Sequence, residues 1–82
     1  MNMKRQELLQ KVKYRRSQLG ITFEELSKLS GVNTRTMMRF FAGDDAKLST
    51  LEKINSVLGL DLAGNEVVDI QSLLEKRAKL QK

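Results

Sequence analysis

Apolar residues recur every three or four positions along most of the chain, which is the spacing of one face of an α-helix. This pattern predicts five helices, over residues 4–19, 22–30, 34–42, 49–58 and 69–80. A glycine directly follows each of the first four segments, where helices often end. The alternation of apolar and polar residues that marks a strand is almost absent, and only residues 67–68 are a candidate extended segment. The sequence therefore predicts an all-α fold.

Polar residues at the expected helix starts predict side-chain caps. Thr22 with Glu25, and Ser49 with Glu52, fit the capping box, in which each of the two side chains bonds a backbone N–H of the other residue. Asn33 is a suitable cap for the third helix. These caps predict where the second, third and fourth helices begin.

The second and third predicted helices are joined by only three residues, 31–33, of which the first is a glycine. Two short helices joined in this way form the helix-turn-helix motif, although similar pairs also occur in proteins that do not bind DNA. At about 100° per residue, Met37 and Phe40 lie on one side of the third helix, and we expect them in the core. The opposite side carries Thr34, Arg35, Met38 and Arg39. The two arginines on this outward side favour a DNA-reading role.

Composition narrows the function further. A chain of 82 residues forms one small domain. It contains no Cys and no His, which removes disulfides, thiolate chemistry, the commonest general base and the commonest zinc ligands. We therefore expect no catalytic residue, no metal site and no cofactor, and we do not expect an enzyme. Apolar runs long enough for a membrane span or a signal peptide are also missing, which favours a cytoplasmic location.

Positive charge is concentrated at the start of the chain. The net charge is +5, and residues 1–19 alone account for that excess. Helical spacing predicts Lys4, Lys11 and Arg15 on one stripe beside the apolar face, with Arg16 on the apolar side. A concentrated basic surface suggests a polyanionic partner, nucleic acid first and an anionic membrane second. A solvated helix face is the alternative.

A longer pattern of glycines, caps and apolar positions runs from residue 8 to residue 62. It consists of GITFEELS at 20–27, LSGVN at 29–33, Met37, Phe40, Gly43, LSTLEKI at 48–54 and LGL at 58–60. This ordered set, preceded by RRSQL at 15–19, resembles the phage repressor and Cro type of helix-turn-helix domain (XRE-like). The resemblance covers about two thirds of the chain.

The resemblance implies a compact, lambda-repressor-like bundle of about five helices. Its third helix would enter the DNA major groove, and a homodimer would bind a palindromic operator in double-stranded DNA. The implied base contacts are Thr34, Arg35, Met38 and Arg39, with Thr36 beside them. The candidate phosphate contacts are Thr22, Asn33, Lys47 and Thr50, to which the basic first segment adds Lys11 and Arg15.

Three positions depart from the family pattern. Phe23 stands where a polar glutamine usually helps to hold phosphate. Asp44 and Asp45 make the loop after the third helix acidic, and carboxylates near phosphate repel it. Members often pair an arginine at position 16 with an acid at position 41, and here position 41 is Phe. We expect Arg16 to stack on Phe41 instead, as a cation–π contact.

The C-terminal segment lies outside the resemblance. We therefore divide the chain into a DNA-binding domain over residues 1–62 and an extension over residues 63–82. The predicted helix over 69–80 is amphipathic, with Ile70, Leu73 and Leu74 on one face. Because a helix this short is marginal in water, it needs something to pack against. It could fold back on the domain, pair with a second copy, or bind another protein through residues 67–80, and we favour the dimer.

Together these observations predict a sequence-specific DNA-binding regulator, a repressor of bacterial or phage type located at the nucleoid. One alternative is an antitoxin, which would bind both operator DNA and a toxin. The other is a protein-interaction module built on a helix-turn-helix scaffold, which Phe23 and the acidic loop favour.

Overall fold

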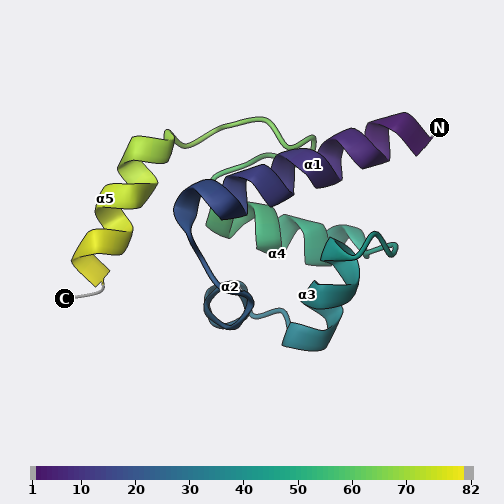
Figure 1. The fold of residues 1–82 in the computed structure, drawn as a ribbon, viewed down its shortest axis with the longest axis horizontal. Helices are drawn as coiled ribbons and strands as arrows, with labels where there is room; N and C mark the ends of the chain where they lie inside the picture. Colours follow the sequence, from purple (N-terminus) through teal and green to yellow (C-terminus); the bar gives the residue numbers. More distant parts are fainter. Residues whose placement is uncertain (1, 81–82) are drawn as a thin grey trace.

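The computed structural model describes residues 2–80 and the side chains of residues 5–79, so the side chain of Lys4 lies outside the described part. Within this part the chain forms five helices and no strand, which confirms the predicted all-α bundle (Figure 1). The helices are α1 (Asn2–Leu19), α2 (Phe23–Ser30), α3 (Thr34–Phe41), α4 (Leu48–Leu58) and α5 (Ile70–Leu80).

The helices surround one small core. Figure 1 shows α1 along one side of the molecule with α4 next to it, and α2 and α3 beyond α4. In the contacts between elements, α2 packs against α3 and α4, and α1 packs against α4 and α5. Every helix from α1 to α4 contributes side chains to the core, which includes Val12, Leu26, Met37, Phe40, Ile54 and Leu58.

The predicted caps of α2 and α3 are confirmed. The Thr22 hydroxyl accepts a hydrogen bond from the backbone N–H of Glu25 at 3.1 Å, and the Asn33 side chain accepts one from Thr36 at 2.8 Å. Only half of the first capping box forms, and the Glu25 carboxylate accepts a hydrogen bond from Arg77 of α5. A distant cation thus takes the place of the local backbone donor.

The second predicted capping box is wrong. α4 begins at Leu48, one residue earlier than predicted, and Lys47 is its N-cap without a side-chain hydrogen bond. Ser49 therefore already lies inside the first helical turn, and it does not occupy the position from which a hydroxyl caps a helix. The same signature that marks the start of α2 correctly is misplaced here.

After α4 the chain returns along α1. Leu60 and Glu66 form an isolated antiparallel bridge, and the backbone N–H groups of Val67 and Val68 both donate to the Gly59 carbonyl. In Figure 1 this returning segment passes on the side of α1 that faces away from α2 and α3. It carries α5 to the end of α1, so the bundle is closed by residues far apart in sequence.

The tail helix folds back on its own domain, which is one of the three arrangements considered from the sequence. Ile70, Leu73 and Leu74 of α5 pack against the core. The approach is close at Gly59, because a Cβ atom at this residue would lie 2.7 Å from Cδ1 of Leu73. The apolar face of α5 is therefore partly covered by the domain itself, and its three residues are half-buried.

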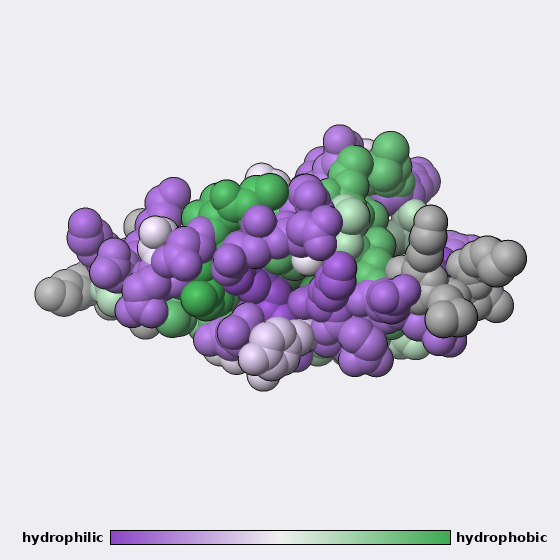
Figure 2. All heavy atoms as spheres, turned by 90° about the horizontal axis from the view of Figure 1, so that it is seen from above, coloured by the Kyte–Doolittle hydropathy of each residue, from purple (hydrophilic) through white to green (hydrophobic). Residues whose placement is uncertain are grey.

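Hydrophilic side chains cover most of the face formed by α1 and the returning segment. Figure 2 shows this face from above, with two separate hydrophobic areas, one toward α5 and one toward the start of α1. Among the residues that the structure describes, no helix is long and apolar enough to cross a membrane.

Candidate nucleic-acid interface

The turn between α2 and α3 is held by several local hydrogen bonds. Gly31 adopts a left-handed conformation with φ 78°, and its N–H donates to the Ser27 carbonyl at 2.9 Å. The Ser27 hydroxyl donates to the Val32 carbonyl at 2.5 Å, and the N–H of Val32 donates to the Ser30 hydroxyl at 3.2 Å. Because Val32 is also buried, the angle between the two helices is fixed.

The two sides of α3 differ as the sequence predicts. Met37, Phe40 and Phe41 are buried against the rest of the domain. On the other side Arg35, Met38 and Arg39 are exposed, and the side chain of Arg39 has a relative exposure of 66%. The remaining implied base contact, Thr34, is half-buried at the first position of the helix, as is Thr36 two residues later.

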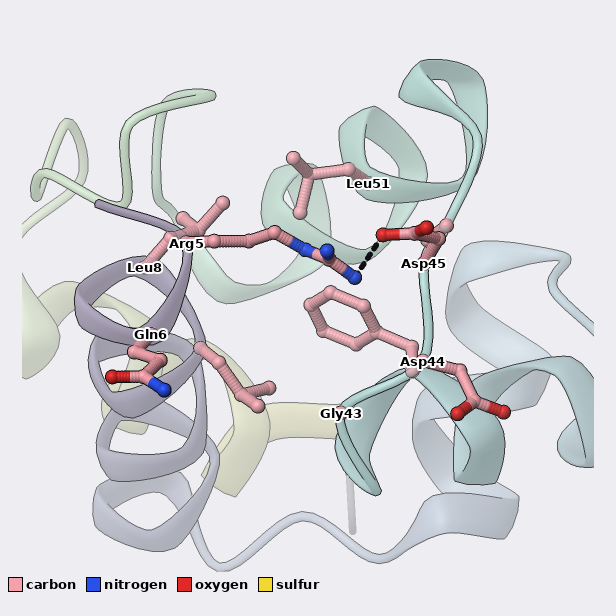
Figure 3. A pocket seen from close by; sticks show the side chains of 10 residues that line it. Arg5, Gln6, Leu8, Gly43, Asp44, Asp45 and Leu51 are labelled. Atoms are coloured by element: carbon pink, nitrogen blue, oxygen red, sulfur yellow. Dashed lines mark ion pairs between the residues drawn. The ribbon is translucent and has the colours of Figure 1, made fainter. Parts of the chain in front are cut away.

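The acidic loop after α3 is paired with two arginines. Asp44 contacts Arg39 of α3, with 3.3 Å between Oδ2 and Nε, and Asp45 forms an ion pair with Arg5 of α1. Figure 3 shows the Arg5 side chain reaching Asp45, whereas the Asp44 carboxylate points away from Arg5. The repulsion of phosphate expected from two unpaired carboxylates is therefore reduced, since each has a cation beside it.

Arg5 and Asp45 lie at an open cavity of about 650 Å³ between the start of α1 and the loop after α3. Leu8, Leu51 and Phe40 form its apolar wall (Figure 3). Sequence reasoning did not single out Arg5 as a partner of the loop. Its contact with Asp45 joins residues 40 positions apart, and no local pattern encodes a contact at that separation.

Arg16 explains two of the three departures from the family pattern together. Its guanidinium lies over the ring of Phe23, 4.2 Å from the centroid, and 5.5 Å from the centroid of Phe41. The stacking on Phe41 predicted from the sequence is thus confirmed, and Phe23 is the closer ring. The guanidinium also donates to the Ile21 carbonyl at 2.7 Å. Phe23 and Phe41, with ring centroids 5.3 Å apart, form one aromatic site for this cation.

The structure overturns the prediction that Arg15 is an exposed phosphate contact. Arg15 is only 4% exposed. Its Nε donates to the Leu58 carbonyl at 2.7 Å, Nη1 bonds Glu66 at 2.6 Å, and Nη2 donates to the Val68 carbonyl. The hydrogen bond from Arg15 lowers the pKa of the Glu66 carboxyl below its ordinary value.

A signal for this burial was present in the sequence. Val12, Arg15 and Leu19 follow one another at steps of three and four residues, so all three lie on one helix face. The sequence could not show which acceptors would satisfy the guanidinium, because these come from residues 58, 66 and 68.

The other candidate phosphate contacts fall into two groups. Thr22 and Asn33 are exposed at the starts of α2 and α3, and Lys47 is exposed at the start of α4, with Thr50 half-buried one turn later. Lys11 lies elsewhere, because its amino group donates to the Asn65 side chain at 3.2 Å, in the segment that returns along α1. The structure therefore does not bring Lys11 together with α3.

Comparisons with protein-family models, with curated proteins and with solved structures find no match for this chain. Among the described residues, no group of three or more acidic side chains is placed to hold a metal ion.

Proposed function

We propose that the protein binds double-stranded DNA in a sequence-specific manner and regulates transcription, with α3 as the reading helix. One observation carries this proposal: α3 buries one side completely and presents Arg35, Met38 and Arg39 on the other. An α-helix fits the major groove, and arginine is the side chain that most often reads guanine there, through N7 and O6. A half-site that contains guanine is the expected target.

The surroundings of α3 support docking on the DNA backbone. Phosphates bind readily at helix N-termini, where backbone N–H groups are unpaired and the helix dipole is positive. Thr22 lies at the start of α2, within the helix-turn-helix, and Lys47 lies at the start of α4. In this proposal these residues hold the protein on the duplex, and the exposed side of α3 reads the bases.

The proposal includes a homodimer on a palindromic operator, which would repress transcription by occluding a promoter. Two half-sites then lie about 34 Å apart, one helical turn of DNA. Because Ile70, Leu73 and Leu74 already pack partly against their own domain, a dimer contact through α5 has only their exposed parts to use, unless the two copies exchange α5.

Selection from random duplexes followed by sequencing tests the proposal. We expect an enriched half-site with guanine, and an affinity for it that falls steeply with salt, because each neutralised phosphate adds about −0.9 to the log–log slope. Arg35→Ala and Arg39→Ala should each cost about 1–3 kcal/mol on the selected duplex and much less on random DNA.

Lys79→Ala is the control, because it also removes one exposed cation, but from α5 and not from the exposed side of α3. It should leave the preference for the selected duplex unchanged. A selection that enriches no sequence, together with a salt slope near zero, would contradict the proposal.

A second candidate is a protein-interaction module on the same scaffold. The observation that favours it is the position of Asp44 and Asp45, two carboxylates directly after α3. A protein surface with basic residues would tolerate them better than phosphate does. The duplex selection separates the two candidates, because an interaction module enriches no DNA sequence.

A further inference from the structure

The end of α3 has a geometry that brings Asp44 beside Arg39. The N–H of Gly43 donates to the Phe40 carbonyl and the N–H of Asp44 donates to the Arg39 carbonyl, both at 3.0 Å. With Gly43 at φ 106°, these two bonds form the Schellman motif, in which the residue after the glycine returns to the last turn of the helix. The backbone thus places the two side chains together.

The side-chain contact at this motif is unusual in its chemistry. An apolar pair commonly accompanies a Schellman motif, whereas here a carboxylate meets a guanidinium. Oδ2 of Asp44 lies 3.3 Å from Nε of Arg39. Because the contact uses Nε, the terminal nitrogens Nη1 and Nη2 stay available on the far edge of the guanidinium.

We propose that Asp44 is a positioning residue for Arg39, which makes base reading more selective. This inference rests on the proposed DNA-binding function. A bidentate contact with guanine requires two donors of the guanidinium fork in one orientation, and a long exposed side chain otherwise samples many rotamers. Asp44 holds the Nε side and leaves the terminal edge for O6 and N7 of the base.

The Asp44 carboxylate also disfavours contacts between Arg39 and DNA phosphates. A phosphate close to Arg39 also lies close to Asp44, and the two negative charges repel each other. Asp44 therefore lowers the affinity for DNA of any sequence while it favours the guanine contact. Selectivity at the base read by Arg39 rises, and non-specific affinity falls.

Asp45 provides a matched control at the next position. It carries the same charge in the same loop, but it pairs with Arg5 and not with Arg39 (Figure 3). Asp44→Asn and Asp45→Asn remove one negative charge each and leave the main-chain bonds of the motif intact. A difference between them thus reports the contact with Arg39, and a shared effect reports charge alone.

The experiment uses the duplex enriched by the wild-type chain, every single base-pair replacement of it, and a random duplex. The position read by Arg39 is the one where a replacement weakens the wild type but not Arg39→Ala. At that position we expect Asp44→Asn to lose about two- to fivefold of the discrimination, the usual size of an exposed ion-pair effect. Both variants should bind the random duplex more tightly, and Asp45→Asn should keep its discrimination.

A conservative variant at position 44 shows whether a loss of discrimination comes from the position of the Arg39 side chain or from a general disturbance of the loop. Asp44→Glu keeps the negative charge that attracts the guanidinium, which Asp44→Asn removes, so it should restore part of the discrimination that Asp44→Asn loses. Equal discrimination in the wild type and in Asp44→Asn would overturn the inference, as would an equal loss in Asp45→Asn. If the wild type enriches no duplex, both the proposed function and the inference are wrong. If it enriches a duplex but Asp44→Asn keeps full discrimination, only the inference is wrong.

Discussion

The helix-turn-helix and the tail are stabilised in opposite ways. The hydrogen bonds that shape the α2–α3 unit join residues two to five positions apart, such as those of Thr22, Ser27 and Asn33. Those that attach the tail join residues more than 50 positions apart: Arg15 bonds Glu66 and Val68, and Arg77 bonds Glu25. The α2–α3 unit is therefore shaped by residues close together in the sequence. The tail is held by residues far from it in the sequence.

Replacing Arg15 should have the largest effect on stability, because this residue holds the returning segment against α1. We expect Arg15→Met to lower the free energy of unfolding by about 3 kcal/mol, because the carbonyls of Leu58 and Val68 lose a buried donor. Urea denaturation measures this loss. α5 should detach first, which hydrogen exchange of the backbone amides in α5 would detect.

Lys13→Met is the control for this prediction, because it makes a similar change on the exposed side of the same helix. It should change the free energy of unfolding by less than about 0.5 kcal/mol. An equal loss in both variants would mean that helix propensity or solubility, and not the buried network, is responsible.

Removing a helix cap in the α2–α3 unit should lower the free energy of unfolding by a smaller amount. Asn33→Ala removes the acceptor for the N–H of Thr36, and we expect a loss of about 1 kcal/mol in the free energy of unfolding. Ser49→Ala is the matched control, because α4 begins before Ser49 and takes no cap from it. A loss at Ser49 as large as that at Asn33 would contradict the observed start of α4.

The smallest expected effect is a dependence on pH. Since the hydrogen bond from Arg15 lowers the pKa of Glu66 in the folded state, the ionised carboxylate stabilises the fold above its ordinary value of 4.5. This contribution is lost as the pH falls through the lowered, folded-state pKa. In Glu66→Gln the free energy of unfolding, measured by urea denaturation from neutral pH to about pH 3, should depend less on pH than in the wild type. A dependence in Glu66→Gln as steep as that of the wild type would contradict the prediction.

The contrast also explains how much could be predicted from the sequence. The five helices, the turn at Gly31 and the outward side of α3 follow from spacing and caps, which act within a few residues. Ser49 failed as a cap because Lys47 and Leu48 begin α4 earlier, and a capping signature does not exclude a neighbouring start.

Long-range polar contacts were the part that could not be predicted. The spacing of apolar residues identifies a buried helix face, yet it does not show that Arg15 on that face will meet carbonyls from residues 58 and 68. Similarly, Glu25 fits a capping box by every local criterion, and only the folded tail reveals Arg77 beside it. Within the site, the Arg39–Asp44 contact was accessible in principle, because it follows from one glycine and a helix end.

The position of the partners of Arg15 has a consequence for synthesis on the ribosome. The chain emerges from its N-terminus, so α1 is exposed to the solvent of the cell before residues 66–68 have been translated. During that interval the guanidinium keeps its hydration shell, and dehydrating it without acceptors is costly. We therefore expect Arg15 to reach its full set of acceptors only when the returning segment lies against α1 and α4, so that the domain and the tail fold in one cooperative step.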